Sequence, residues 1–388
     1  MISYGKQSID QKDILSVSRV LKGNIITQGK EIQKFENLIN DKFGSKYSCA
    51  VSSGTAALYL SGMALNWKAN DIVLTTPITF VATANCIVHA GATPDFVDIN
   101  SKNYTIDLNS LEDKIKFYKK KNTKIKAVIG VDYAGHPCDW ESLRYLSNKY
   151  NFTLINDNCH ALGSEYKGNK KYAIKYADLV THSYHPVKHI TTGEGGNILT
   201  NDKKIYQRLK SLRSHGIFRS NNLQFKKGLW YYEMRDLGYN FRITDFQCAL
   251  GASQLGRLDK YVNLRKRVAD LYNKSFNKIE FLTVPVTNDS TKHSYHLYPL
   301  LINFKKLRIT KKQLFISFLK KGIQLQVHYI PIYKQPYYKK NYFYKLKNFP
   351  NANLFYEKEV SLPIYPLLKK KNIDYIIKNI LALDKFKI

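Results

Sequence analysis

The stretch Lys46–Leu65, KYSCAVSSGTAALYLSGMAL, contains the pattern that decides the fold. Its first part, KYSCAVSS, is an apolar run that predicts a buried strand. Its second part, GTAALYLSGMAL, has small and apolar residues at a spacing typical of a helix. A strand that runs directly into a helix is the repeating unit of an α/β protein.

The same alternation continues along the chain from about residue 9 to residue 275. We predict strands at DIVLTTP (71–77), TPDFVDI (93–99), KIKAVIGVDYAG (124–135) and FTLINDN (152–158). Helices are predicted at 11–23, 79–91, Leu108–Tyr118 and Trp140–Tyr150. Strands that are nearly all apolar are typical of a parallel sheet covered on both faces. The sequence therefore predicts an α/β fold with a mainly parallel sheet.

The pattern changes after Gly238. Residues 241–276 have apolar positions at helical spacing and predict one long helix, with a kink near Gly251 or Gly256. Beyond it we predict strands at EFLTVPV, HLYPLLINF and IQLQVHYI, and helices at KKQLFISFLKKG and near Ile373–Leu383. We therefore expect a large domain over residues 1–250, which includes the N-terminal segment, and a smaller C-terminal α+β domain over residues 251–388, joined by the long helix.

The charge balance is strongly basic, with 61 Lys+Arg against 30 Asp+Glu and a net charge of +31 among 388 residues. Only 11 of the basic residues are arginines, whereas 50 are lysines. Proteins that read phosphates and base edges rely on the planar arginine fork. An anionic small substrate is therefore favoured over nucleic acid, and most lysines are expected on solvated faces.

The cysteines and the apolar runs exclude other classes. The five cysteines are scattered and form no CxxC pair, so we expect buried thiols rather than disulfides or a cysteine-rich metal site. No apolar stretch approaches the roughly 20 residues that cross a bilayer, and the start MISYGKQSIDQKDIL lacks an export signal. We therefore expect a cytoplasmic protein with no membrane partner and no metal.

Two candidate site segments follow predicted strands, whose carboxyl ends carry the ligands of α/β sheets. Ser52–Ala56 joins a strand to a helix, where free backbone N–H groups bind anions; the alternative is ordinary helix capping. Asp157 closes FTLIND, where it is either the N-cap of a following helix or a carboxylate that keeps a ring nitrogen protonated. His160, three residues later, is either a ligand contact or a core histidine.

The third segment is Thr181–Gly196, THSYHPVKHITTGEGG. Lys188 stands between a predicted strand (177–182) and a glycine-rich turn, together with Ser183 and Gly193–Gly196. A lysine in a partly apolar pocket has a lowered pKa and becomes nucleophilic, as Schiff-base chemistry requires. These neighbours distinguish Lys188 from the many surface lysines.

Taken together, an Asp that closes a strand, Ser-x-x-x-x-Lys and Gly-Glu-Gly-Gly resemble the DegT/DnrJ/StrS family of sugar aminotransferases. The resemblance extends from Tyr4 to the C-terminal strand. It implies pyridoxal 5′-phosphate as cofactor and the fold type I of PLP-dependent transferases, which is aspartate aminotransferase-like. It further implies that Lys188 forms the Schiff base, that Asp157 pairs with the pyridine nitrogen, and that His160 lies near the phenolic oxygen. Asn156 departs from the family, which usually has Glu there.

The resemblance also assigns residues around the rest of the cofactor. It implies that Gly54, Thr55 and Ser183 hold the phosphate, with Ser53 beside them. Phe80 occupies the position of the aromatic residue that stacks on the ring. Asn240 matches an asparagine that reaches the phosphate site of a neighbouring subunit, so a homodimer is implied.

Several stretches are similar to a branch of the family that acts on UDP-linked sugars: NIITQG, TTPITFVATAN, VDYAG, HALGSEY, ITTGEGG and QVHYIPIY. This implies transfer of the amino group of L-glutamate to the 4-keto group of a UDP-linked 4-keto-6-deoxy-N-acetylhexosamine, giving UDP-4-amino-4,6-dideoxy-N-acetyl-β-L-altrosamine for pseudaminic acid synthesis. The implied nucleotide-sugar contacts are Tyr4, Asn24, Ile25, Ile26, Thr27, Gln326, Val327, His328 and Tyr329.

Four alternatives remain at this stage. A regulatory or structural protein that kept the fold without catalysis would be expected to have lost some of Lys188, Asp157 and Ser183, and all three are present. Sister aminotransferases act on other 4-keto or 3-keto sugars with UDP, dTDP or GDP carriers. A related dehydratase has His in place of the cofactor-binding lysine, and Lys188 argues against it. A basic polyanion-binding protein without catalysis predicts lysines clustered on one face and salt-sensitive association with nucleic acid.

Overall fold

A seven-stranded sheet forms the centre of the computed structural model, which describes residues 1–286 and 290–388. Its strands stand in the order β1-β8-β7-β5-β4-β2-β3, and only β8 runs antiparallel to its neighbours. The bounds are β1 (Tyr47–Val51), β2 (Ile72–Thr75), β3 (Thr93–Phe96), β4 (Ile125–Val131), β5 (Thr153–Asp157), β7 (Leu179–Ser183) and β8 (Gly196–Thr200). The predicted α/β fold with a mainly parallel sheet is confirmed.

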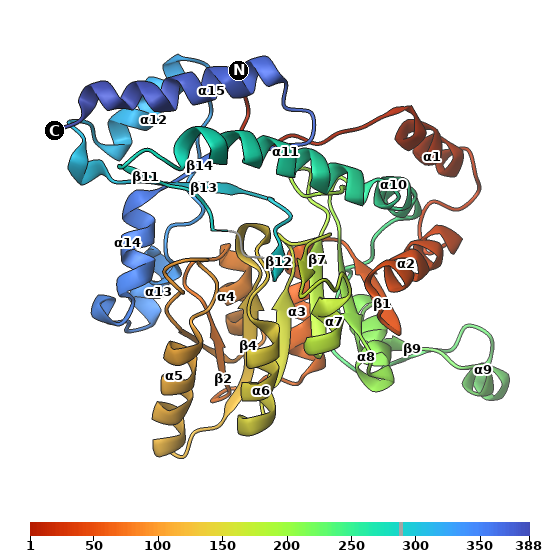
Figure 1. The fold of residues 1–388 in the computed structure, drawn as a ribbon. Helices are drawn as coiled ribbons and strands as arrows, with labels where there is room; N and C mark the ends of the chain where they lie inside the picture. Colours follow the sequence, from red (N-terminus) through yellow and green to blue (C-terminus); the bar gives the residue numbers. More distant parts are fainter. Residues whose placement is uncertain (287–289) are drawn as a thin grey trace.

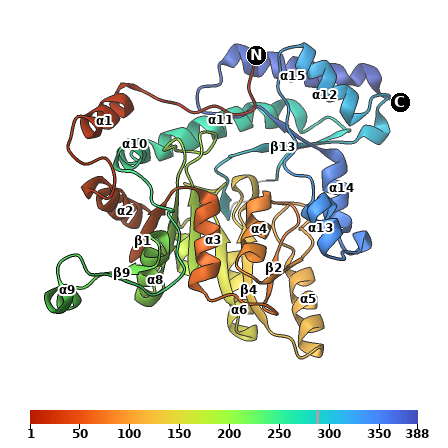
Figure 2. The same cartoon turned by 180° about the vertical axis from the view of Figure 1, so that it is seen from behind.

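Helices cover both faces of this sheet, as Figures 1 and 2 show from opposite sides. Successive strand residues point to opposite faces, so Leu154 packs into one apolar core and Ile155 into the other. One face carries α3 (Gly54–Ala64), α4 (Val81–His89) and α8 (Lys203–Arg213); the other carries α2 (Lys30–Phe43), α5 (Leu108–Lys120), α6 (Trp140–Tyr150) and α7 (Tyr172–Tyr176).

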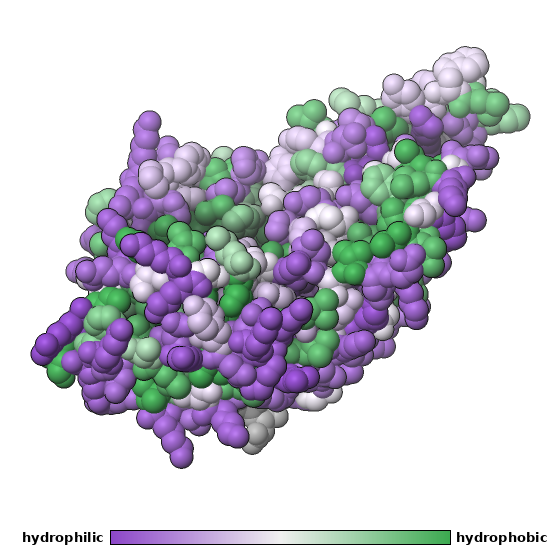
Figure 3. Space-filling view, turned by 90° about the horizontal axis from the view of Figure 1, so that it is seen from above, coloured by the Kyte–Doolittle hydropathy of each residue, from purple (hydrophilic) through white to green (hydrophobic). Residues whose placement is uncertain are grey.

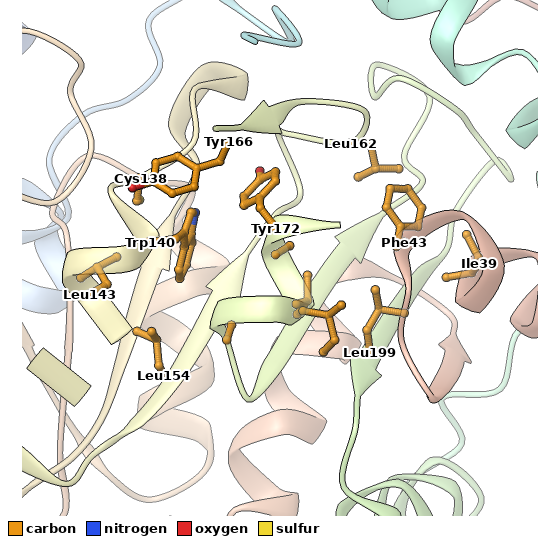
Figure 4. Close-up of a cluster of buried hydrophobic side chains, with 14 of the residues drawn as sticks. Ile39, Phe43, Cys138, Trp140, Leu143, Leu154, Leu162, Tyr166, Tyr172 and Leu199 are labelled. Carbon is orange, nitrogen blue, oxygen red and sulfur yellow. The ribbon is translucent and has the colours of Figure 1, made fainter. Parts of the chain in front are cut away.

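The core on the second face contains large aromatic side chains beside aliphatic ones (Figure 4). Trp140 is fully buried, and Tyr166 and Tyr172 are nearly so. Trp140 and Tyr172 also carry polar atoms, which bind a buried carboxylate described below. The same side chains therefore pack against this face of the sheet and take part in a polar network.

The predicted single long helix over residues 241–276 is two helices, α10 (Asp245–Leu255) and α11 (Leu258–Phe276). The break lies at Gly256 and Arg257, between the end of α10 and the start of α11. Glycine is a poor helix former, which favours the interruption of the helical hydrogen bonds at this point. Gly251, the other predicted kink, lies inside α10. A Cβ there would come within 2.7 Å of the Phe35 ring, so its smallness serves close packing.

The C-terminal part builds a second core around a three-stranded antiparallel sheet, β11 (Leu282–Thr283), β13 (Tyr298–Ile302) and β14 (Glu359–Leu362). Its helices are α12 (Lys311–Lys320), α13 (Pro336–Asn341), α14 (Pro350–Lys358) and α15 (Lys370–Leu381). From the side of α12 and α15 the surface is mostly hydrophilic (Figure 3). The division of the chain at residue 250 stays a prediction.

The predicted strand IQLQVHYI is wrong. Only isolated bridges join this segment to its neighbours, Ile323 with Ile2 and Gln326 with Ser361. Continuous pairing is lost because residues 326–329 line a cavity instead of continuing a ladder.

An arm that the sequence analysis did not anticipate projects from the body (Figures 1 and 2). It contains β9 (Ile217–Phe218), α9 (Asn221–Lys227) and β10 (Glu233–Met234). Phe225 and Trp230 on it are 91% and 80% exposed. The remaining elements are α1 (Gln11–Leu21), which packs on α10, and β6 (Glu165–Tyr166), which pairs with β12 (Thr291–Lys292). Among the described residues, no helix is long and apolar enough to cross a bilayer.

Candidate active site

A cavity of about 540 Å³ lies at the carboxyl ends of β1, β5 and β7. All three segments singled out in the sequence meet there, because the carboxyl ends of parallel strands share one edge of a sheet. The predicted residues that line the cavity are Tyr4, Ser53, Gly54, Thr55, Phe80, Asp157, His160, Ser183, Lys188, Gln326, Val327, His328 and Tyr329.

The first segment forms the start of α3. The Ser53 side chain caps the helix by accepting a hydrogen bond from the Ala56 N–H at 3.0 Å, so the capping interpretation holds for this residue. The helix begins at Gly54, and its first N–H groups face the cavity edge without an intrahelical acceptor. A Cβ on Gly54 would lie 2.8 Å from the Ser183 Cβ. The close approach of helix and strand therefore leaves an anion-sized cradle.

The second segment places a carboxylate in the cavity wall. No helix starts after Asp157, so it is not the N-cap that the alternative required. Asp157 is 5% exposed; its Oδ2 accepts from the Thr83 hydroxyl at 2.7 Å and its Oδ1 from the Cys159 N–H at 3.2 Å. These donors hold the carboxylate in one orientation toward a ligand.

A second buried carboxylate, Asp132, stands behind the sheet edge and explains Asn156. Asp132 accepts hydrogen bonds from Trp140 Nε1 at 2.9 Å, Tyr172 Oη at 2.7 Å and Asn156 Nδ2 at 3.2 Å. Burial raises the pKa of Asp132 to about 6. Asn156 points to the opposite face of β5 from Asp157. A glutamate at this position, usual in the family, would bring a like charge to Asp132, whereas the amide donates to it.

The third segment places the half-buried amine of Lys188 in the cavity wall. Lys188 Nζ lies 3.4 Å from His296 Nε2. Across the described ranges no carboxylate lies within ion-pair distance of this amine. Burial lowers the pKa of Lys188, and the nearby Cys159 and Asp157 offset only part of that effect. A lysine whose neutral form is favoured in this way is suited to attack a carbonyl carbon.

The residues that the sequence analysis did not single out include His296, which lines the cavity, and Arg265, which holds the Lys188 loop from outside it. The fully buried Arg265 on α11 donates to the Val187 carbonyl at 3.0 Å and to the Ile364 carbonyl at 2.9 Å, so it joins the Lys188 loop to the C-terminal part. A basic residue at an apolar position of the helical repeat was the signal that could have found Arg265. For His296 the sequence has no such signal, since its role depends on the tertiary approach to Lys188.

His160 is neutral in this arrangement. Burial and the charge of Lys188 hold its pKa well below the ordinary range. Its Nδ1 accepts from the Ala134 N–H at 3.4 Å, so Nε2 carries the proton and donates to Tyr329 Oη at 3.1 Å. The pair forms one wall of the cavity, and the Phe80 ring lies 5.9 Å from the Tyr329 ring.

Some predicted residues do not reach the cavity of this chain. Ile25 and Ile26 are exposed, and the Thr27 backbone bridges to Thr244 at the start of α10. Asn24 is likewise exposed at the surface. Asn240 is exposed and bridges to Ser214, in a segment that runs beside the end of β1. The predicted roles of Asn24–Thr27 and Asn240 stay predictions.

The arrangement fits pyridoxal phosphate. The Gly54 cradle suits its phosphate, Asp157 suits its ring nitrogen, and the amine of Lys188 suits its aldehyde. A mainly parallel sheet whose edge carries these three groups defines a PLP-dependent enzyme of the aminotransferase class.

The chain belongs to the DegT/DnrJ/EryC1/StrS aminotransferase family, whose model matches residues 7–381. It is 41% identical over 376 residues to the UDP-4-amino-4,6-dideoxy-N-acetyl-β-L-altrosamine transaminase of Campylobacter jejuni subsp. jejuni serotype O:23/36, covering 97% of this chain and 96% of that one. The protein is thus a PLP-dependent sugar aminotransferase, as the sequence motifs predicted.

Solved structures agree. Helicobacter pylori PseC, described as an aminotransferase involved in pseudoaminic acid biosynthesis, has a TM-score of 0.89 and 33% identity over 99% of this chain and 100% of that one. A sugar aminotransferase from Streptococcus pneumoniae, Spr1654, in its PMP form has a TM-score of 0.90 and 27% identity over 99% of each chain. The cofactor is therefore pyridoxal 5′-phosphate, which alternates with its amine form.

Proposed function

We propose that the protein transfers the amino group of L-glutamate to the 4-keto group of a UDP-linked 4-keto-6-deoxy-N-acetylhexosamine, giving UDP-4-amino-4,6-dideoxy-N-acetyl-β-L-altrosamine. The observation that carries this proposal is the 41% identity, over nearly the full length of both chains, to a transaminase with that product name. Tyr4, Gln326 and His328 lie in the cavity wall beside the cofactor residues, which supports a sugar site next to the reacting amine.

The chain's own residues divide the work. Bound pyridoxal phosphate supplies the electron sink that stabilises a carbanion on the substrate. Lys188 holds the cofactor through Nζ and, once displaced by the amino donor, moves a proton at the substrate carbon as a general acid and base. Asp157 keeps the ring nitrogen protonated. Gly54, Thr55 and Ser183 would hold the phosphate, and Phe80 would pack on the ring.

We also propose a homodimer in the cytoplasm. The arm exposes Phe225, Leu229 and Trp230, and a soluble monomer rarely exposes such a run of large apolar residues. Asn240 lies near the base of this arm with its side chain outward, which supports a role in a neighbouring subunit. Light scattering of wild type and Trp230→Ser tests the assembly: dimer mass for the former and a weakened dimer for the latter are expected.

The reaction is tested in two stages. Purified protein is first mixed with pyridoxal phosphate, and the absorption band of the lysine-bound cofactor is followed while L-glutamate is added; fading to the shorter-wavelength amine form is expected. The UDP-linked 4-keto sugar is then added, and the dTDP- and GDP-linked 4-keto sugars are tested in separate reactions. The product of each reaction is identified by NMR. Lys188→Ala removes the first band, whereas the exposed Lys312→Ala retains it. Turnover by Lys188→Ala, or preference for another carrier, would contradict the proposal.

A further inference from the structure

Three buried polar residues stand in line behind one wall of the cavity. Ser361 Oγ lies 2.8 Å from His328 Nδ1 and donates its proton to Glu359 Oε1 at 2.5 Å. Glu359 Oε2 also accepts from the His328 backbone N–H at 3.1 Å. Glu359 is 0% exposed and Ser361 1%. Both side chains stand on the same face of β14, two residues apart, so the strand itself sets their spacing.

No ion pair compensates the charge of this carboxylate within the described residues. Glu359 has no ion-pair partner among the described residues, and the Lys311 ammonium, whose charge acts on Glu359, donates instead to the Tyr356 carbonyl at 2.8 Å. Burying a carboxylate without a paired cation costs several kcal/mol. A strand position in the core is more stable with an apolar residue, so the presence of Glu359 calls for a role beyond packing.

The other end of the line opens into the cavity. His328 lines the cavity, and its Nε2 makes no hydrogen bond within the described part of the chain. A neutral imidazole carries one proton, and the partner of one nitrogen decides which nitrogen holds it. The state of Nδ1 therefore fixes whether Nε2 donates or accepts toward a ligand.

The hydroxyl of Ser361 passes the state of Glu359 to His328. When Glu359 is ionised, Ser361 donates to it and accepts from His328 Nδ1–H, so Nε2 is an acceptor. When Glu359 is protonated, it donates to Ser361, Ser361 donates to Nδ1, and Nε2–H is a donor. Each hydroxyl has one proton to give, so the two arrangements exclude each other.

We propose that Glu359 and Ser361 are positioning residues that set the tautomer of His328, and thereby decide whether His328 Nε2 donates to the carboxylate of the amino donor or accepts from a hydroxyl or amide of the sugar. The inference rests on the proposed function, in which one cavity must bind a dicarboxylate amino acid and a nucleotide sugar in turn. Burial raises the pKa of Glu359 to about 7, which keeps both arrangements accessible near neutral pH.

The surroundings of the pair contain few other groups that titrate near neutrality. Glu359 faces Lys311 from α12, and the phenols of Tyr104, Tyr133 and Tyr329. His328 faces Lys188, His160 and the phenols of Tyr4 and Tyr329. The pKa values of the phenols are raised, and burial lowers those of both imidazoles, so neither set titrates around pH 7.

Two variants separate the effect of Glu359 from that of Ser361. In Glu359→Gln the amide carbonyl keeps the His328 backbone N–H, because the NH₂ group would face that donor if the amide turned. The NH₂ then donates to Ser361, which donates to Nδ1, and Nε2–H is fixed at every pH. In Ser361→Ala the connection is broken. Glu357→Gln, an exposed residue two positions away, and Ser317→Ala are the matched controls.

The first readout is the protonation of the His328 ring nitrogens in the PLP-loaded enzyme, measured by nitrogen–proton NMR of histidine-labelled protein and assigned with His328→Gln. We expect the wild-type tautomer to change between pH 6 and pH 8, Glu359→Gln to show Nε2–H throughout, and Ser361→Ala to show no change at all. An identical tautomer in wild type and both variants would overturn the proposal. This readout requires no turnover, so it is independent of the proposed sugar substrate.

The second readout is the KM for L-glutamate across the same pH range. A hydrogen bond to a charged group corresponds to about a tenfold change in affinity. We expect the wild-type KM to rise about tenfold between pH 6 and pH 8 and the Glu359→Gln KM to stay at its low value, with kcat changed little. Equal pH profiles for Glu359→Gln, Glu357→Gln and wild type would refute the role of the pair, whereas absence of turnover with every keto sugar would refute the proposed function alone.

Discussion

Replacing Arg265 with methionine is the sharpest test of how the Lys188 loop is held. The guanidinium is fully buried and binds only backbone carbonyls, those of Val187 at 3.0 Å, Ile364 at 2.9 Å and His296 at 3.2 Å among them. Burial lowers its pKa to about 9, which leaves it charged at neutral pH. Methionine fills the space of the aliphatic stem and removes every donor.

The expected loss of stability follows from these contacts. The backbone carbonyls that Arg265 binds would stay buried without donors, and each unsatisfied buried acceptor costs about 1–3 kcal/mol. Relief of the guanidinium's own desolvation offsets part of this, so we expect a decrease of about 3 kcal/mol in the free energy of unfolding. Arg265→Lys retains the charge but reaches fewer carbonyls, and its decrease is expected to be about half as large.

Urea unfolding of the PLP-loaded protein measures the decrease, with Arg267→Met as control, because Arg267 lies two residues further along the same helix and is exposed. The absorption band of the lysine-bound cofactor provides a second readout, since Lys188 follows directly after Val187 in the loop that Arg265 holds. We expect this band to weaken in Arg265→Met. Unchanged stability and an unchanged band would refute the view that this arginine joins the Lys188 loop to the C-terminal part.

Three further outcomes follow from single contacts. Gly54→Ala places a Cβ 2.8 Å from that of Ser183, so the phosphate cradle must open, and we expect cofactor affinity measured by titration to fall about tenfold or more while the fold is retained. Asp157→Asn removes the proposed partner of the ring nitrogen, and kcat should fall by at least about 100-fold with little change in KM for either substrate. Glu359→Gln removes a carboxyl whose pKa is raised by burial from 4.5 to about 7. Because the folded state binds this proton more tightly than the unfolded state, the free energy of unfolding of the wild type falls as pH rises from 4.5 to 7. In urea unfolding the wild type should lose about 3 kcal/mol relative to the variant over that pH range.

The sequence predicts the sheet and the centre of the site because both depend on local patterns. The strands that end at Val51 and Asp157 are mostly apolar, the strand that ends at Ser183 is short and buried, and polar residues stand at the end of each. The convergence of Ser53, Asp157 and Lys188 then follows from the parallel topology. The α6 bounds, Trp140–Tyr150, agree residue for residue with the prediction. The resemblance to a known family added the chemistry to these positions.

The rest could not be predicted because it depends on contacts between distant segments. No strand was predicted at β8, which runs antiparallel to its neighbours, and the arm has no core of its own that a periodicity would mark. IQLQVHYI has the alternation of a strand, yet it pairs with β14 through a single bridge, Gln326 with Ser361, before His328 reaches the cavity wall. His296 is assigned to the site only by its approach to Lys188.

The net charge of +31 is carried by the surface of the protein and not by the cavity. The cavity contains one lysine, Lys188, against two carboxylates, Asp157 and Glu194, and burial keeps the imidazoles of His160 and His296 neutral. The site itself is therefore not basic, although the chain is. Most of the other lysines are exposed, and their summed field draws an anionic nucleotide sugar toward the protein. Inside, neutral donors and acceptors do the selecting, and this suits a cavity that must release one anion and bind a different one in each cycle, because a dense cluster of fixed cations would bind both without distinction.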